Sequence, residues 1–254
     1  MTIRAIAVNT FREAIRDRIL YLLLFFAVTA MIFSRLLALL TVGDRVKIIV
    51  DVGMGSLALF GTLMAILMGT GLVYKEIDKK TIYTLLSKPI QRWQFLLGKF
   101  FGLILTLAIM MAAMSLIFLL LVLAHAGRPT WDMLAGLAFI FLELGLITAV
   151  ALFFSCFSTP ILSSIFTLSF YLIGHLSWGL ETLIAKLRPG AGRAAVQIVY
   201  TLLPDLENFN FKTEIVHHLP IALPVMGSAL LYGLLYTAFV LAAAILVFRR
   251  RDFL

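Results

Sequence analysis

Six long apolar runs occupy most of this 254-residue chain. Each run is rich in Leu, Ile, Phe, Ala and Val and is bounded by charged residues, Pro or Gly. An α-helix needs about 20 apolar residues to cross a bilayer, whereas the strands of membrane β-barrels alternate and lack such runs. The sequence therefore predicts an all-α integral membrane protein, a single transmembrane domain over residues 1–254 with six transmembrane helices. We place the spans at residues 19–41, 52–73, 99–124, 132–155, 160–178 and 226–248.

The composition agrees with a membrane protein. Hydrophobic residues make up 62% of the chain and charged residues 13%, whereas about 25% of the residues in soluble domains are charged. We interpret the net charge of +8 as cationic anchors at the membrane surface, and not as a nucleic-acid surface. The single cysteine, Cys156, excludes an internal disulfide. The first apolar run is too long for a cleavable signal peptide and lacks a small-residue cleavage site.

Basic residues favour the cytoplasmic side of a membrane protein, and they determine the predicted orientation. With a cytoplasmic N-terminus, thirteen of the 21 Lys and Arg residues lie on the inner side, within residues 1–18, 74–99 and 249–251. Eight basic residues then lie on the outer side. We therefore expect a multi-pass protein of the cell inner (plasma) membrane, with both termini in the cytoplasm.

Residues 1–18 have the pattern of an amphipathic helix that lies in the inner membrane interface. The apolar side chains recur at helical spacing on one face, and most of the arginines fall on the other. No Pro or Gly separates this helix from the first span, so it could act as a stiff lever or as a simple anchor. The apolar face consists of Ile3, Ile6, Ala7, Phe11, Ala14 and Ile15.

Glu143 and His175 are the polar candidates inside the predicted spans, and a charged side chain at the centre of a bilayer costs about 2.5–3.5 kcal/mol on insertion scales. Glu143, near the middle of span four, could face a solute path, contact a partner subunit or relay protons, or it could be protonated or hydrogen-bonded within the bundle. His175 lies nearer the outer end of span five, so depth does not indicate a pair with Glu143. We interpret His175 as an interfacial residue. Proton coupling would need a connected chain of such groups.

Residues 179–225 are expected to form an outer-face region between spans five and six, with short helices broken by prolines. His217 and His218 occur there, with Met226 nearby. Imidazole and thioether groups can bind copper, but adjacent histidines on a surface loop are usually only polar residues, and we predict no metal site. In span two, the glycines between 53 and 71 predict close packing against another helix or a second subunit.

Motifs for catalysis are absent from the sequence. It contains no Walker loop, GxSxG, HExxH or CxxC pattern, and the "LLGKFFG" stretch lacks the other residues of a Walker loop. We therefore predict no catalytic residues, no cofactor bound by this chain, and no enzyme activity of its own.

Residues 74–99 form the most charged stretch of the chain and are expected in the cytoplasm between spans two and three. From Glu76 to Ser87 there is no Pro or Gly, and apolar residues recur at helical spacing. Acidic residues favour a helix start and Pro89 stops the helix after Lys88, so the pattern predicts a short amphipathic helix. The following "IQRWQFLLGKF" begins a second helix that leads into span three. The short helix could dock into a groove of a cytoplasmic partner or lie on the membrane.

The stretch "GTGLVYKEIDKKTIYTLLSKPIQRWQFLLGKFFG" resembles the signature cytoplasmic loop of ABC-2 type transporter permeases. In that family an acidic residue, a Thr-Ile or Thr-Leu pair, "LLS-x-P", an Arg and a "GK" follow the second span. The segments "NTFREAIRDRILYLL", "FSCFSTP" and "FRRRDFL" resemble other parts of the same family, so the likeness covers essentially the whole chain. It is greatest to the subgroup of permeases for multicopper-enzyme maturation, which "LLPDLENFNF" also resembles. The matching loop positions are Glu76, Thr81, Leu85, Leu86, Ser87, Pro89, Arg92, Gly98 and Lys99.

The resemblance implies the transmembrane subunit of an ABC transporter, an exporter of an unidentified substrate. It further implies a second permease subunit, in a homodimer or heterodimer, and ATP-binding cassette ATPase subunits that bind ATP and Mg. Residues 75–88 would then form the coupling helix that seats on the ATPase. On this interpretation the ATPase is coupled through Glu76, Ile77, Asp78, Thr81, Ile82, Leu85, Leu86, Ser87, Lys88, Pro89 and Arg92.

Two other functions remain open from the sequence. An ion-coupled secondary transporter could use Glu143, although no inverted repeat is evident. A non-transporting assembly factor could instead recruit an ATPase to act on an outer-face protein through residues 179–225.

Overall fold

The computed structural model describes residues 2–40, 44–78, 91–126, 129–187, 203–217 and 219–250, with a few residues between 190 and 200. Every regular element in this part of the chain is a helix, which confirms the predicted all-α class. The elements are α1 (Thr2–Ala14), α2 (Arg18–Leu40), α3 (Arg45–Asp78), α5 (Arg92–Ala126), α6 (Trp131–Ser155), α7 (Pro160–His175), α8 (Ser177–Lys186), the 3₁₀ helix η1 (Leu206–Phe209), α10 (Lys212–Val216) and α11 (Leu223–Arg250).

Five of the described helices are long and apolar enough to cross a membrane: α2, the Arg45–Gly71 part of α3, α5, α6 and α11. They correspond to five of the six predicted spans. The remaining prediction, residues 160–178, coincides with α7, which is apolar but has only 16 residues. The structure therefore supports a multi-pass membrane protein in which α7 is shorter than the helices at the other five predicted spans.

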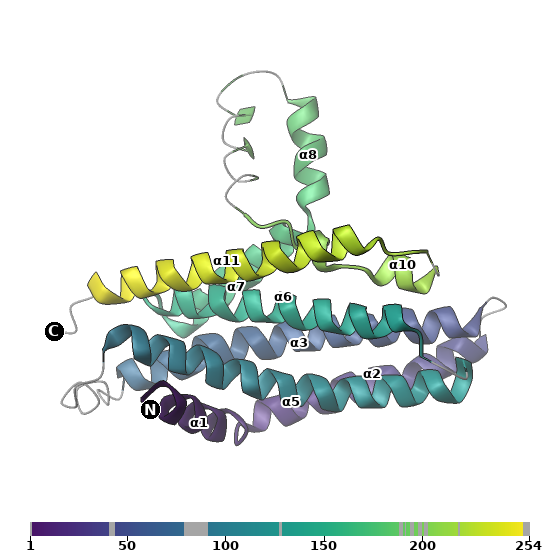
Figure 1. Cartoon of the computed structure of the whole chain (residues 1–254), viewed down its shortest axis with the longest axis horizontal. Helices are drawn as coiled ribbons and strands as arrows, with labels where there is room; N and C mark the ends of the chain where they lie inside the picture. The colour runs from purple at the N-terminus through teal and green to yellow at the C-terminus, as the bar shows by residue number, and fades with distance from the viewer. Residues whose placement is uncertain are drawn as a thin grey trace.

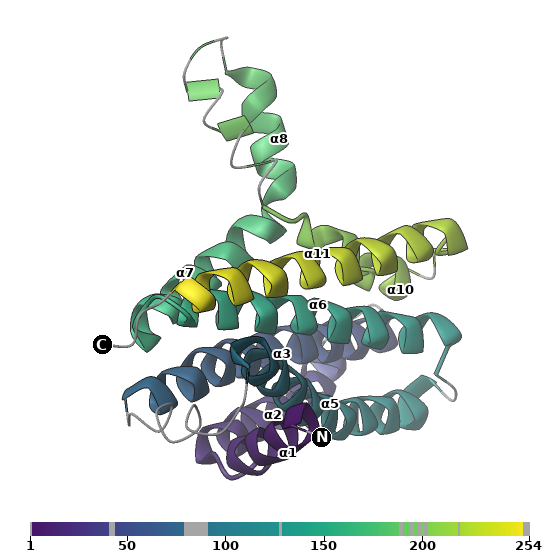
Figure 2. The same cartoon turned by 60° about the vertical axis from the view of Figure 1, so that its left-hand side comes forward.

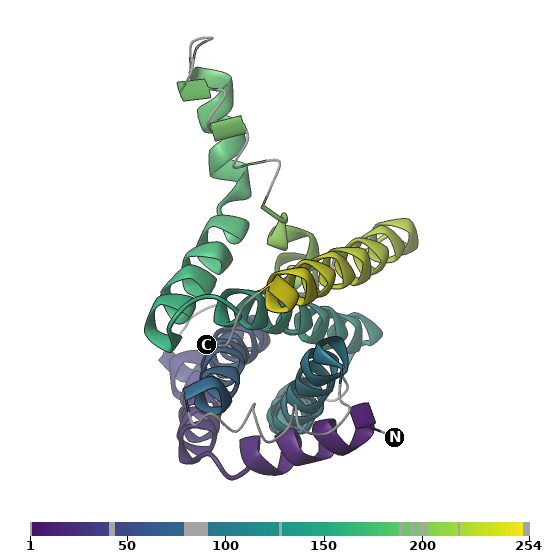
Figure 3. The same ribbon diagram turned by 90° about the vertical axis from the view of Figure 1, so that its left-hand side faces the viewer.

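The long helices run side by side, and both chain termini lie at the same end of the bundle (Figure 1). We call this end proximal and the opposite end distal. α1 lies across the proximal end (Figure 3), whereas α8 projects away from the bundle in each view (Figure 2). α3 and α5 have 34 and 35 residues, so each is about 50 Å long, which exceeds the ~30 Å hydrocarbon core. Both are therefore long enough to extend beyond the membrane.

The α1 helix packs on α5 through two glycines of the "GKFFG" stretch. A Cβ added to Gly98 would lie 2.7 Å from Ile6 Cβ, and one added to Gly102 would lie 2.6 Å from the backbone oxygen of Ala7. Only glycine at these positions permits so close an approach. The face of α1 that meets α5 therefore includes the predicted apolar face.

A turn separates α1 from α2, so the two helices do not form the continuous stiff lever that the sequence permits. Helix α1 ends at Ala14, and the side chain of Asp17 accepts a hydrogen bond from the backbone N–H of Ile19 at 3.0 Å. Aspartate near a helix start satisfies backbone donors that have no partner inside the helix. This cap begins α2 as a new helix without any Pro or Gly.

Glycines in α3 allow it to pack closely on α6, as the sequence predicts for span two. A Cβ added to Gly61 would lie 2.7 Å from Leu144 Cδ1, and one added to Gly69 would lie 2.5 Å from Ala151 Cβ. Gly71 differs, because nothing lies within 4 Å of an added Cβ.

This difference gives a matched pair of substitutions in one helix. Alanine is favoured over glycine inside a helix by about 0.5–1 kcal/mol, so Gly71→Ala should leave stability unchanged or raise it slightly. Gly69→Ala should lower stability by about 1–3 kcal/mol, because the new methyl group overlaps the rigid Cβ of Ala151. Thermal unfolding of both variants in detergent, followed by size-exclusion chromatography, measures the effect. Equal stability of the two variants would contradict the close α3–α6 contact.

Candidate functional site

Three ionisable side chains meet inside the bundle at the end of α7. His175 Nε2 lies 2.8 Å from Glu143 Oε1, and His175 Nδ1 lies 3.3 Å from Glu207 Oε2. The three residues come from α6, α7 and η1, so one imidazole joins three elements. The exposed fraction of the side chain rises from 4% at Glu143 through 24% at His175 to 46% at Glu207. We call these residues the carboxylate–histidine bridge.

The contact between Glu143 and His175 is a pairing that the predicted depths of the two residues did not indicate. Glu143 is twelve residues from either end of α6, at its middle. Helix α7 begins at Pro160 and ends after 16 residues, so it is about 24 Å long and shorter than the ~30 Å hydrocarbon core. Its end therefore falls near the level of Glu143. A depth estimate that assumes a full-length span places His175 too far toward the surface.

The chain returns to this level in residues 203–216, which we call the re-entrant segment. Asp205 caps η1: its Oδ1 accepts hydrogen bonds from Glu207 N at 3.2 Å and from Ser177 Oγ at 2.7 Å. Its backbone N–H donates to the hydroxyl of Tyr232 in α11 at 3.0 Å. Irregular backbone at membrane depth requires such partners, because lipid supplies none.

Apolar side chains of the re-entrant segment pack along the distal half of α6. Phe211 meets Phe139 edge to face, with ring centroids 4.8 Å apart. Ile215 and Met54 of α3 both lie close to Gly136, where an added Cβ would be 2.4 Å from Ile215 Cδ1 and 2.7 Å from Met54 Cε. This segment packs against the bundle, whereas the sequence analysis places it in a separate outer-face region. Its buried apolar side chains are Leu206, Phe209, Phe211, Ile215 and Val216.

A cavity of about 240 Å³ lies between α3, α6, α7 and the re-entrant segment. Near it, Lys212 Nζ of α10 pairs with Asp51 Oδ1 of α3 at 2.9 Å. Charged side chains at membrane depth face protein or water, because their exposure to lipid is costly. The cavity can hold water or a small polar solute. Its polar lining comes from Glu143, Tyr171, His175, Asn210 and Lys212.

The described residues do not support the copper site considered from the sequence. Nowhere in them do three His, Cys, Asp or Glu side chains come together as a possible metal site. His217 follows α10 and is exposed, and His218 lies outside the described residues. Met226 instead lines an apolar groove.

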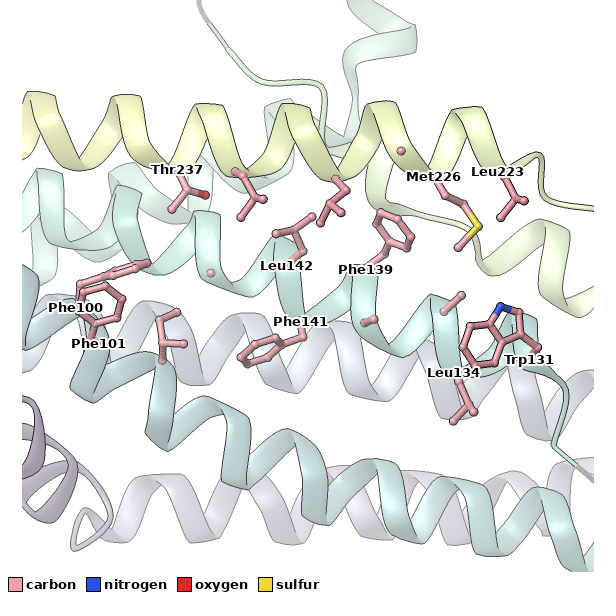
Figure 4. Close-up of a pocket in the computed structure, with 17 residues that line it drawn as sticks. Phe100, Phe101, Trp131, Leu134, Phe139, Phe141, Leu142, Leu223, Met226 and Thr237 are labelled. Atoms are coloured by element: carbon pink, nitrogen blue, oxygen red, sulfur yellow. The ribbon is translucent and has the colours of Figure 1, made fainter.

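This apolar groove runs between α5, α6 and α11 and has a volume of about 750 Å³ (Figure 4). Phe139 and Leu142 reach it from α6, and Met226 reaches it from α11 (Figure 4). Among its lining residues, only Trp131 and Thr237 carry a polar side-chain atom. The groove can hold apolar chains, but its side chains offer no charge to a solute.

The structure describes the two ends of the predicted coupling segment. The last turn of α3 contains Glu76, Ile77 and Asp78. The sequence analysis predicts that these residues begin a short helix, but in the structure they end a long one. The absence of Pro and Gly after Gly71 explains this difference, since nothing stops the span from continuing. The predicted positions outside the described residues are Thr81, Ile82, Leu85, Leu86, Ser87, Lys88 and Pro89.

Arg92 begins α5, as predicted for the helix that leads into span three, and it also contacts α11. Its Nη1 donates hydrogen bonds to the backbone oxygens of Phe248 at 3.1 Å and Arg249 at 2.9 Å. Carbonyl groups in the last turn of a helix lack partners within that helix, so they are available to such a donor. No sequence signal indicates this contact, which joins two distant parts of the chain.

A second basic residue of α5 is buried where α1 packs. The Lys99 side chain is only 1% exposed, and its Nζ lies 3.7 Å from Glu13 Oε2 of α1. The proximal end of α5 therefore contacts α1 through Lys99 and α11 through Arg92.

The long apolar helices define a multi-pass membrane protein. A family model described as "ABC-2 family transporter protein" matches residues 4–253. The chain therefore belongs to this family and is the transmembrane permease subunit of an ABC transporter. No match was found among the curated proteins. The likeness to the multicopper-enzyme maturation subgroup stays a prediction.

The cap at Asp205 can be tested by substitution. Asp205→Ala removes the acceptor for Glu207 N and Ser177 Oγ, and loss of such a cap costs about 0.5–2 kcal/mol. We expect a lower midpoint of thermal unfolding in detergent and faster proteolysis within the re-entrant segment. Thr213→Ala, at an exposed position of α10, is the control and should behave like the unchanged protein. Similar behaviour of the two variants would argue against the cap.

Proposed function

We propose that this permease subunit belongs to an exporter that is driven by a separate ATP-binding cassette ATPase. A second permease subunit, identical or different, completes the membrane part. Both termini and the residues that link α3 to α5 lie in the cytoplasm, and the complex resides in the cell inner membrane. ATP and Mg bind to the ATPase subunit, and this chain moves the substrate.

The single observation that carries this proposal is the pair of long helices that flank residues 79–90. Helix α3 continues through Asp78, and α5 starts again at Arg92, so the linking residues join two helices of about 50 Å. Because helices transmit displacement as rigid elements, a push on these linking residues moves α3 and α5 along their length. The contacts of α5 with α1 and α11 spread that displacement to both terminal helices.

An ion-coupled secondary transporter is the second candidate, and the carboxylate–histidine bridge favours it. The bridge connects Glu143 to the partly exposed Glu207, which supplies the chain of ionisable groups that Glu143 alone would lack. Transport in proteoliposomes separates the two functions. The exporter requires the ATPase and ATP, whereas an ion-coupled transporter works with the isolated chain and an ion gradient.

Association with an ATPase can be tested through the apolar residues of the predicted coupling helix. The double substitution Leu85→Asp and Leu86→Asp should remove an ATPase that co-purifies with the chain in mild detergent, because two carboxylates cannot enter an apolar groove. Leu219→Asp is the control, since Leu219 is 51% exposed near the distal end and should have no effect. Retained thermal stability shows that the double variant folds. An undiminished amount of co-purified ATPase would exclude the coupling role.

The contact between Arg92 and α11 gives a second test. Arg92→Ala removes both hydrogen bonds to the end of α11. We expect the ATPase to bind, while its stimulation by the permease falls about tenfold, which lies within the usual range for coupling between sites. Arg92→Lys should retain part of the stimulation, because lysine keeps a donor but not the guanidinium geometry. Arg12→Ala, which changes an exposed arginine of α1, is the control. Unchanged stimulation in Arg92→Ala would show that coupling does not pass through this contact.

A further inference from the structure

One imidazole links the start of the re-entrant segment to α6, in addition to the contacts of Asp205 and Lys212 described above. His175 ends α7, and its two ring nitrogens reach carboxylates on α6 and on η1. Glu207 uses its other carboxylate oxygen to accept a hydrogen bond from Asn210 Nδ2 at 2.8 Å. The bridge thus fastens the start of the re-entrant segment to the middle of the bundle.

The proton content of this bridge follows from the chemistry of imidazole. A neutral imidazole has one N–H and one lone pair, so it can donate to only one of two carboxylates. Both contacts of His175 are hydrogen bonds only when the three residues share one additional proton, either on the ring or on a carboxyl group. Without that proton a ring lone pair faces a carboxylate oxygen, and one of the two contacts becomes repulsive.

The remaining polar groups around His175 do not replace this proton. Tyr171 of α7 lies edge to face with the imidazole, with ring centroids 4.6 Å apart. On α10, Lys212 is paired with Asp51 of α3, and at the start of η1 the carboxylate of Asp205 accepts from Ser177 and from backbone. The bridge itself therefore provides the proton site, and the partly exposed Glu207 gives protons access to it.

We propose that the carboxylate–histidine bridge is a proton-carrying latch for the re-entrant segment. With its proton, the bridge holds the start of residues 203–216 against α6 and α7, where the segment forms one wall of the cavity. When the proton leaves, the neutral ring keeps the shorter contact, to Glu143, and loses the longer one, to Glu207, so the start of the segment is released. This regulation goes beyond the proposed export function, and it is tested without an ATPase.

Met54 is the reporter position for release. Its side chain is 2% exposed and lies beside Ile215 of the re-entrant segment at Gly136. Met54→Cys in a Cys156→Ser background places the only thiol of the chain there, because Cys156 is the single native cysteine. The rate of modification by a water-soluble methanethiosulfonate is measured on the full chain in mild detergent. The same rate at Leu219→Cys, an exposed position, corrects for ionisation of the thiol.

The latch predicts a different pattern for each variant. With the native bridge, corrected modification should become about tenfold faster as the pH rises from about 6 to about 9, since the proton is lost. Glu207→Gln should stay protected throughout, because the amide can donate to the ring lone pair and accept from Asn210 without an additional proton. His175→Ala and Glu207→Ala should be modified rapidly at every pH. His217→Ala, an exposed histidine, should behave like the native bridge.

Two results would overturn the proposal. If the alanine variants are as protected as the native bridge, then the bridge does not hold the segment. If they are modified rapidly but the native bridge shows no pH dependence after correction, then the latch carries no proton. Glu207→Ala changes a half-exposed side chain, so the test remains decisive even where His175→Ala fails to fold. Since no ATPase is present, failure of the latch leaves the export function unaffected.

Discussion

An ionisable side chain in the middle of a membrane bundle must find its partners in protein or trapped water, because lipid offers no hydrogen bonds. Glu143 has this position in α6, and much of the distal half of the structure follows from it. His175 can reach it because α7 ends after 16 residues, short of a full span, and the re-entrant segment then packs along the distal half of α6. The short helix, the irregular backbone and the buried acid are therefore parts of one arrangement.

At the proximal end, different contacts hold α1, α5 and α11 together. Here the contacts combine glycine-mediated approach with buried or partly buried cations. Gly98 and Gly102 bring α1 onto α5, Lys99 lies against Glu13, and Arg92 satisfies the last carbonyls of α11. Each contact uses α5, so this helix joins both terminal helices of the chain into one unit.

The sequence predicts features that depend on local composition, and it does not predict contacts that depend on where a helix ends. Apolar runs predict long helices because helix length and composition are local properties, and α2, α3, α5, α6 and α11 confirm this. The glycines of α3 likewise indicate close packing before the partner helix is known. By contrast, hydropathy cannot distinguish a helix that is a few residues short of a span and followed by a re-entrant return from a full span followed by an outer loop. The bridge of Glu143, His175 and Glu207 was for that reason beyond sequence reasoning, since it depends on where α7 ends.

The two ends of the molecule are connected through α3. At the distal end α3 carries Asp51, which pairs with Lys212, and Met54, which packs beside Ile215. At the proximal end its last turn leads into the residues that join it to α5. The close contact at Gly69 limits independent sliding of α3 past α6, because the two backbones have little side-chain space between them. A displacement of α3 must therefore either carry α6 with it or alter the contacts of the re-entrant segment, and the exposed ion pair of Lys212 is the weaker of these restraints.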